Sequence, residues 1–246
     1  MRLPAPQRRT YASFPCSSVR HSPHSRAHFK QNASPPPILS SFSADRAGVG
    51  CRTKGIPPMR KKPLHILILL GSAREDGNST RLAFAFADAA SLQGHAVQSI
   101  RVPALAIAPC DGCNRCWKPA SVPCALRDDM EAVYPLLRAA DVLVFATPLH
   151  FYSWSAPLKS LVDRFYCLAP SRKRTLKGKQ TLLLATAADD RPAAFAGLQA
   201  TYRLIAGFMG WKPLGEVLVP GVEKEGDIAR SPRFLARAAA LGARLR

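Results

Sequence analysis

The stretch LHILILLGSAREDGNST, residues 64–80, decides the fold. Its first seven residues form a short apolar run, which is typical of a strand buried on both faces of a parallel sheet. The run stops at Gly71, and after a polar loop an apolar-periodic segment opens at Asn78. Backbone N–H groups in such a loop and at a helix start attract anions. The stretch therefore predicts a strand, a phosphate-binding loop and a helix.

The same alternation continues to the end of the chain. Further strands are predicted over residues 95–102, 141–147, 180–187 and 212–219, and helices over residues 80–93, 127–140, 156–168, 192–209 and 231–245. Strands that alternate with helices indicate βαβ units and a parallel sheet. Ligands of such sheets bind at the carboxyl ends of the strands. The loops to inspect are residues 71–80, 103–126, 147–156 and 187–191.

The net charge of +19 is unevenly spread along the 246 residues. Residues 1–62 hold 12 Lys or Arg and one acid, a net +11, which leaves +8 for residues 63–246. The first segment is rich in Pro, Ser and Arg and has no apolar periodicity, so it is predicted to lie outside the folded domain of residues 63–246. Three interpretations remain open: a disordered extension, a transit peptide, or an upstream stretch before a true start near Met59.

Seven cysteines is an odd count, and four of them lie in one short stretch. This pattern favours a reducing compartment over a secreted disulfide framework, and no apolar run is long enough for a membrane helix. A cytoplasmic protein is expected. The spacing is Cys110-x2-Cys113-x2-Cys116-x7-Cys124. Four thiolates so spaced can hold an iron–sulfur cluster or zinc, or stay free or redox-active.

The loop after the first strand offers many polar groups. It matches neither the GxGxxG fingerprint nor a P-loop. Its polar density favours phosphate binding over an ordinary capped turn. The candidate phosphate-binding residues are Ser72, Arg74, Asn78, Ser79 and Thr80.

The stretch TPLHFYSWSAPLKSLVDRFY, residues 147–166, joins the third strand to the next helix. Aromatic side chains and backbone N–H groups at a strand end suit a flat heteroaromatic ring. The alternative is that Phe151, Tyr152 and Trp154 simply pack beneath the helix. Lys159 and Arg164 on that helix are expected to be solvated.

Three blocks together carry a family resemblance: GSAREDGNS at 71–79, CDGCNRCW at 110–117 and DDMEAVYPLLRAADVLVFATPLHFYSWSAPLKSLVDR at 128–164. In this order and spacing, the chain resembles the NADPH-dependent FMN reductase family, and within it the flavodoxin-like group that includes the iron-sulfur flavoproteins. The resemblance covers about residues 63–220. It implies a flavodoxin-like three-layer α/β/α sandwich with a five-stranded parallel sheet.

The resemblance also implies a set of ligands. FMN would place its phosphate on the candidate residues of the first loop, and residues 187–190 would close the far side of the flavin. A four-iron four-sulfur cluster would lie beside the flavin on Cys110, Cys113, Cys116 and Cys124. The flavin ring would lie against Pro148, Leu149, His150, Phe151, Tyr152 and Ser153.

The implied activity is that of an FMN-dependent NAD(P)H oxidoreductase, which passes a hydride from NAD(P)H to the flavin and on to a quinone, a flavin or a similar acceptor. No side chain is needed as nucleophile or general acid. One alternative is an iron-sulfur flavoprotein that acts as an electron carrier. A remote one is a basic nucleic-acid binder stabilised by zinc. The expected partners are a small-molecule acceptor or a redox protein, neither nucleic acid nor membrane, and further copies of the chain in a dimer or tetramer.

Overall fold

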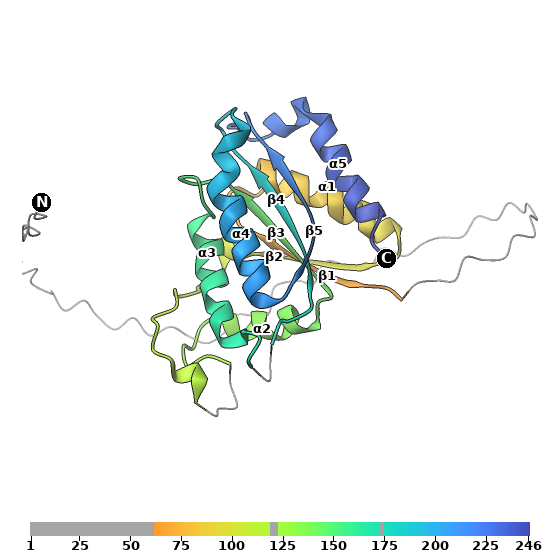
Figure 1. Ribbon diagram of the computed structural model, residues 1–246. Helices are drawn as coiled ribbons and strands as arrows, with labels where there is room; N and C mark the ends of the chain where they lie inside the picture. Colours follow the sequence, from red (N-terminus) through yellow and green to blue (C-terminus); the bar gives the residue numbers. More distant parts are fainter. Residues whose placement is uncertain (1–61, 119–122, 173–174) are drawn as a thin grey trace, which may run out of the picture. The chain divides into compact units, whose positions relative to one another are not determined.

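The computed structural model of the chain describes residues 62–118, 123–172 and 175–246. Predictions about residues 1–61 lie outside this part. Five parallel strands form one sheet in the order β2-β1-β3-β4-β5 (Figure 1). The predicted flavodoxin-like α/β sandwich is confirmed. The strands are β1 (His65–Leu70), β2 (Ala96–Arg101), β3 (Val142–Pro148), β4 (Gln180–Thr186) and β5 (Lys212–Val219).

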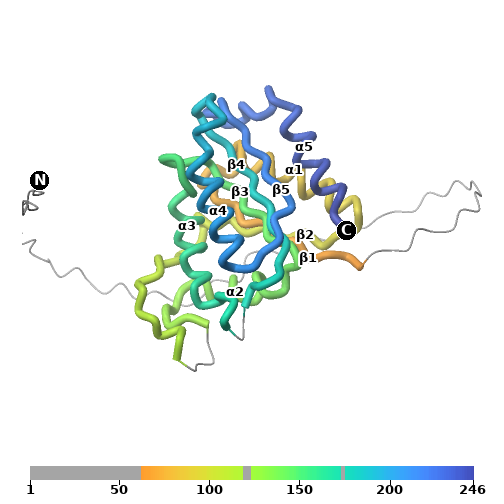
Figure 2. Tube along the Cα trace, in the orientation of Figure 1, coloured from red at the N-terminus to blue at the C-terminus, as the bar shows by residue number. Residues whose placement is uncertain are grey.

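Five α-helices cover the two faces of the sheet (Figure 2). Along β1, Leu67 and Leu69 point into the core beneath α2, α3 and α4, whereas Ile66, Ile68 and Leu70 point into the core beneath α1 and α5. Both faces of β1 are therefore dry, which explains the apolar run in the sequence. The helices are α1 (Asn78–Leu92), α2 (Met130–Ala139), α3 (Ala156–Asp163), α4 (Ala196–Met209) and α5 (Pro232–Ala243).

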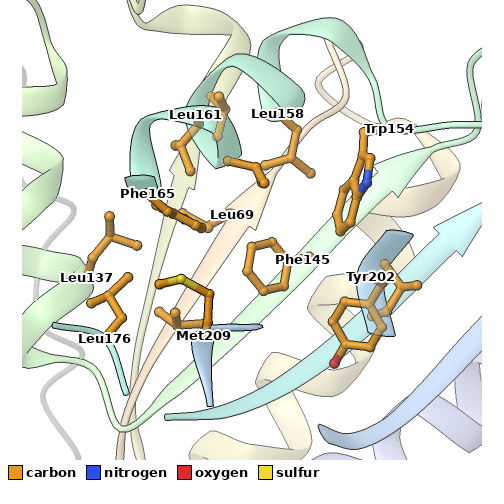
Figure 3. Packing of buried hydrophobic residues seen from close by; sticks show 14 of the residues in the cluster. Leu69, Leu137, Phe145, Trp154, Leu158, Leu161, Phe165, Leu176, Tyr202 and Met209 are labelled. Carbon is orange, nitrogen blue, oxygen red and sulfur yellow. The ribbon is translucent and has the colours of Figure 1, made fainter. Parts of the chain in front are cut away.

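Phe145 of β3 lies at the centre of an aromatic cluster in the core beneath α2, α3 and α4 (Figure 3). Its ring centroid is 5.7 Å from that of Trp154, 6.3 Å from Tyr202 and 5.6 Å from Trp211. Trp154 Nε1 donates to Thr201 Oγ1 at 3.1 Å. The pairs with Trp154 and Tyr202 are edge-to-face, and such pairs add to the free energy gained from apolar burial. The cluster joins the loop after β3 to α4.

Three predicted helices begin or end elsewhere than expected. The helix predicted from residue 127 begins at Met130. Asp128 Oδ1 accepts from Met130 N at its first turn, and the other carboxylate oxygens of Asp128 and Asp129 bind the backbone N–H groups of residues 108 and 106. The helix predicted over 156–168 ends at Asp163 and continues as the 3₁₀ segment η3 (Arg164–Leu168). Another 3₁₀ turn, η4 (Pro192–Phe195), precedes α4. In the described part of the chain no helix is long and apolar enough to cross a membrane.

The contact between α1 and α5 depends on Gly242. A Cβ atom at this position would lie 2.3 Å from Phe86 O and 3.0 Å from Ala90 N, both backbone atoms of α1. Backbone cannot move aside as a flexible side chain can. Glycine at 242 therefore sets how closely α5 approaches α1.

We predict that G242A destabilises the protein by about 1–3 kcal/mol, the usual cost of overpacking a tight contact. Gly207 in α4 provides the matched control, since a Cβ atom there meets nothing within 4 Å. G207A should stabilise the protein by about 0.5–1 kcal/mol because alanine favours the helix. Urea unfolding of both variants checks this, and equal stability of G242A and wild type would contradict it.

Candidate functional site

A cavity of about 370 Å³ lies at the carboxyl ends of the strands. The order β2-β1-β3 means that the chain leaves β1 in one direction and returns to β3 on the other side, and such a reversal opens a crevice. Loops that follow β1, β3, β4 and β5 all contribute to the wall. The lining residues are Ser72, Ala73, Arg74, Gly77, Asn78, Ser79, Pro148, Leu149, His150, Thr186, Ala188, Val222 and Glu223.

The start of α1 presents unpaired donors to this cavity. Within the described residues no side chain caps the helix, and the first backbone N–H to find an acceptor is that of Arg81, which donates to Gly77 O at 3.0 Å. The N–H groups of residues 78–80 are therefore available to a ligand. Gly77 keeps the loop tight, because a Cβ atom there would lie 2.6 Å from Ser72 Oγ. The arrangement suits an anion.

Two predicted phosphate ligands hold the wall of the cavity in place. Asn78 Nδ2 donates to Lys224 O at 2.9 Å, and Asn78 Oδ1 accepts from Ile228 N at 3.1 Å. Arg74 Nη1 donates to Glu223 O at 2.8 Å. Both polar atoms of the Asn78 side chain thus bind the loop after β5. Only the backbone N–H of this residue remains available to a ligand. Arg74 still brings its positive charge to the cavity.

The predicted aromatic segment after β3 is a tight turn. His150 N–H donates to Ser153 O at 3.1 Å, and Ser153 N–H donates to His150 O at 3.0 Å. Between them, Phe151 and Tyr152 have φ angles of +45° and +61°. Bulky side chains rarely adopt this left-handed conformation, so the turn is strained. The side chain of Phe151 is fully exposed, whereas Trp154 is buried in the core, as packing beneath the helix requires.

The loop after β4 forms a further side of the cavity through Ala188. Leu149 N–H donates to Thr186 O at 2.7 Å and fixes the end of β3 against that of β4. In the same loop, hydrogen bonds from Arg191 lower the pKa of Asp189 to about 2. Asp189 therefore stays charged at all physiological pH values.

The structure brings most of the predicted ligands to one cavity. Seven of them line it: Ser72, Arg74, Asn78, Ser79, Pro148, Leu149 and His150. Four do not: Thr80, Phe151, Tyr152 and Ser153. The wall after β5, formed by Val222 and Glu223, was not predicted. The Pro220-Gly221 turn directly after the strand is the signal that could have revealed it.

The cysteines border a different, much smaller cavity of about 10 Å³. A fifth thiol, that of Cys167 in η3, joins the four predicted ones. The loop is fastened to the segment after α3, since Tyr166 Oη donates to Asn114 Oδ1 at 3.2 Å and the rings of Trp117 and Tyr166 are 5.6 Å apart. The lining residues are Cys110, Asp111, Cys113, Asn114, Cys116, Cys124, Asp163, Arg164, Tyr166 and Cys167.

The two cavities share no lining residue. The large cavity borders the loop that leads into α3, and the small one borders η3 at the other end of the helix. In Figure 1 the described first part of the cysteine loop, residues 109–118, runs down past α3 and away from the carboxyl ends of the strands. The cysteine cavity and the candidate cofactor cavity are thus lined separately, and a cluster beside the flavin stays a prediction.

Arg164 is buried, so the prediction of a solvated side chain is wrong. Its guanidinium forms a bidentate ion pair with Asp128 and donates to Ala108 O at 2.9 Å. Burial alone would lower the pKa of Arg164, but the Asp128 carboxylate outweighs it and leaves the pKa raised. Lys159 is exposed as predicted and pairs with Asp163. A charged side chain in a helical pattern can thus be buried when the core holds a carboxylate or carbonyl that accepts its hydrogen bonds.

The side chains at the small cavity are of the type that binds thiophilic metals. Five thiols, four of them from the loop, border one cavity together with Arg164. Across the described residues, however, no three Cys, His, Asp or Glu side chains are already spaced as ligands of one ion. The described cysteines are thus ligands of the right kind without a preformed metal site.

Cys167 differs from the loop cysteines. Its Sγ donates to Arg164 O at 3.1 Å, and burial raises the pKa of the thiol to about 11. At pH 8 only about one Cys167 thiol in a thousand would be ionised, because each pH unit below the pKa cuts the thiolate fraction about tenfold. The thiolate is the nucleophile in alkylation.

We therefore predict that iodoacetamide at pH 8 labels exposed Cys113 well before Cys167, with labelling of Cys167 rising towards pH 11. Peptide mapping by mass spectrometry gives the rate at each cysteine, and urea-unfolded protein serves as the control in which the rates converge. Equal rates in the folded protein at pH 8 would refute the protected position of Cys167.

Comparisons with known proteins agree with this architecture. An iron-sulfur flavoprotein of Archaeoglobus fulgidus is 31% identical over 111 residues, which are 45% of this chain and 49% of that protein. The putative NAD(P)H-dependent FMN-containing oxidoreductase YwqN of Bacillus subtilis is 25% identical over 186 residues, 72% of this chain and 96% of that protein. The chain thus spans about half the length of the first curated relatives it matches.

Among solved structures, the NAD(P)H:quinone oxidoreductase of Methanothermobacter marburgensis aligns with a TM-score of 0.61 at 18% identity, over 75% of this chain and all of that one. This likeness shows the fold. The model of the family described as NADPH-dependent FMN reductase matches residues 64–223, which include every strand and every lining residue of the large cavity. The chain belongs to the NADPH-dependent FMN reductase family.

Proposed function

We propose that this chain is an FMN-dependent NAD(P)H oxidoreductase that passes a hydride from NAD(P)H to the flavin and on to a quinone, a flavin or a similar acceptor. One observation carries the proposal. The large cavity combines the uncapped start of α1 with the segment Pro148–Leu149–His150 at the adjacent strand end. An anion cradle next to an apolar wall is what a flavin with a phosphate tail requires.

The phosphate end of the site is assigned to the loop after β1. The N–H groups of residues 78–80 and the Ser79 hydroxyl would donate to the phosphate, and Arg74 would supply charge. The Ser72 hydroxyl, which donates to Arg74 O at 3.2 Å, would turn to the phosphate instead. Asn78 holds the loop after β5 through its side chain and contributes its backbone N–H. Thr80 is buried behind the cradle. The chain thus binds the phosphate mainly through backbone donors fixed before the ligand arrives.

The ring end of the site is assigned to residues 148–153. Pro148 and Leu149 offer apolar contact, and the turn at Phe151 and Tyr152 extends an aromatic edge into solvent beyond the cavity. FMN, when bound, supplies the hydride and electron chemistry. The protein's part is to bind and orient the ring and to leave one side open to NAD(P)H and the acceptor. No side chain at the cavity is assigned proton transfer.

The remaining proposals concern the setting of the reaction. We infer a cytoplasmic protein from the clustered cysteines that lack a disulfide pattern. We also infer a homo-oligomer, a dimer or tetramer. Exposed Leu204 and Phe208 of α4 are consistent with contacts between copies.

The decisive experiment is steady-state turnover. We predict that the full chain, reconstituted with FMN, shows the two visible flavin bands and oxidises NADPH when a quinone is present. Protein without FMN should be inactive. A flavin that dithionite reduces but neither NADPH nor NADH reduces would exclude the oxidoreductase and favour an electron carrier.

The assignment of the phosphate cradle is tested with the double variant S72A/S79A. We expect it to weaken FMN binding at least about tenfold, since a hydrogen bond to a charged group is worth about 1.5–3 kcal/mol. Flavin fluorescence quenching measures the affinity. S91A, an exposed serine at the other end of α1, is the matched control and should bind FMN as wild type does. Unchanged affinity in S72A/S79A would place the phosphate elsewhere.

The second candidate is an iron-sulfur electron carrier, with a four-iron four-sulfur cluster on Cys110, Cys113, Cys116 and Cys124. The observation that favours it is the convergence of these thiols on one cavity. We predict about four irons per chain after anaerobic reconstitution with iron and sulfide, and a loss of that iron in C113S/C116S. Iron uptake that is the same in the variant would rule out the cysteine site.

A further inference from the structure

The aromatic turn after β3, residues 150–153, holds a conformation that needs support from the rest of the fold. Phe151 and Tyr152 both have left-handed φ angles, +45° and +61°. Such strain persists only where the surrounding structure over-determines the backbone. Two hydrogen bonds within the turn join His150 and Ser153. His150 also lines the large cavity, so a support that fixes the turn fixes the end of this cavity wall.

The first support is Gly197, in the first turn of α4. A Cβ atom at this position would lie 3.0 Å from Tyr152 O, which is closer than ordinary van der Waals contact. The backbone carbonyl of the aromatic turn therefore lies against the bare Cα atom of the glycine. A side chain at position 197 would displace that carbonyl by a few tenths of an ångström. Glycine at this position thus lets α4 and the aromatic turn meet directly.

The second support is Thr201, which lies one helical turn after Gly197 and therefore on the same face of α4. Trp154 Nε1 donates to Thr201 Oγ1 at 3.1 Å, and the Thr201 hydroxyl itself donates to Leu198 O at 2.9 Å. Trp154 is buried, so its indole N–H depends on this acceptor. A buried donor that loses its acceptor costs stability. Thr201 thus fixes the residue that directly follows the aromatic turn.

Helix α4 also joins the aromatic turn to another side of the cavity. The loop after β4 lines the cavity through Ala188 and leads through η4 directly into α4. The ring of Trp154 packs beside that of Tyr202 of α4, with centroids 6.4 Å apart (Figure 3). Two sides of the cavity therefore depend on the position of one helix.

We propose that Gly197 and Thr201 are positioning residues of the flavin site. Gly197 acts through the carbonyl of Tyr152, and Thr201 acts through the indole of Trp154. Together they hold the aromatic turn and fix the wall at residues 148–150, against which the flavin ring would lie. The role of this wall rests on the proposed function. The support of the turn by α4 does not, so it can be measured on protein without flavin.

The first experiment is chymotrypsin digestion of the full chain without added flavin. Chymotrypsin cleaves after aromatic residues when a segment opens, and the rate follows the population of the open form. Cleavage after Phe151 or Tyr152 reports opening of the aromatic turn. Cleavage after Phe84 in α1, on the other face of the sheet, reports general unfolding. Mass spectrometry of the fragments gives the ratio of the two rates.

T201V keeps the shape of the side chain but removes the acceptor for Trp154. We expect it to raise the cleavage ratio about tenfold, because an unsatisfied buried donor favours the open form. T201S retains the hydroxyl and should return the ratio to the wild-type value. G197A should raise the ratio about fivefold, since its methyl group crowds Tyr152 O. The matched control is G207A in the same helix, where a Cβ atom meets nothing within 4 Å, and it should leave the ratio unchanged.

The second experiment repeats the comparison with FMN bound. The visible bands of a flavin respond to the groups around its ring, so T201V and G197A should shift them, whereas T201S and G207A should not. FMN affinity should fall less in T201V and G197A than in S72A/S79A, since the phosphate cradle after β1 is untouched.

A wild-type cleavage ratio in both T201V and G197A would overturn the proposal, even if cleavage after Phe84 rises in parallel. A rise in one variant alone would overturn the role of the other residue. If T201V does not fold, G197A decides. Unshifted flavin bands in both variants would overturn the link between the aromatic turn and the flavin. The proposed reaction is judged separately, by NADPH turnover of the wild-type protein.

Discussion

The position of β1 between β2 and β3 is the constraint on which the large cavity depends. The chain leaves β1 towards β2 and returns to β3 on the other side, so the loops that follow β1 and β3 separate at the carboxyl edge. Burial of both faces of the sheet fixes this order, because β1 and β3 must lie where helices can cover them on each side. The position of the crevice therefore follows from how the strands and helices pack, and the loop residues determine only its lining.

Much of this arrangement was predictable from the sequence because its determinants are local. Apolar runs mark β1, β3 and β4, which are buried almost throughout, and the Gly77-Asn78 junction marks the start of α1. The polar loop after β1 identifies the cradle because helix starts attract anions whatever their context. Four of the seven predicted ligands that line the cavity lie in this loop or at the start of α1, namely Ser72, Arg74, Asn78 and Ser79.

What the sequence did not reveal depends on contacts between distant residues. Arg164 reads as a surface charge, and only the fold brings it to Asp128, 36 positions earlier. The side chain of Asn78 reads as a phosphate ligand, yet it binds a loop about 150 positions later. That Cys167 joins the four loop cysteines around one small cavity was also missed, because the spacing of the loop thiols says nothing of a cysteine more than 40 positions later.

The strained turn at Phe151 and Tyr152 shows where this fold gives up stability. Two left-handed aromatic residues in succession cost on the order of 1–3 kcal/mol each, and both rings stay largely in water. Selection for thermostable variants would thus favour glycine or asparagine at positions 151 and 152, because these residues adopt such turns without strain. Such substitutions would raise the stability of the protein but would remove the aromatic side chains beside the cavity. Higher stability would therefore cost ligand contacts at these two positions.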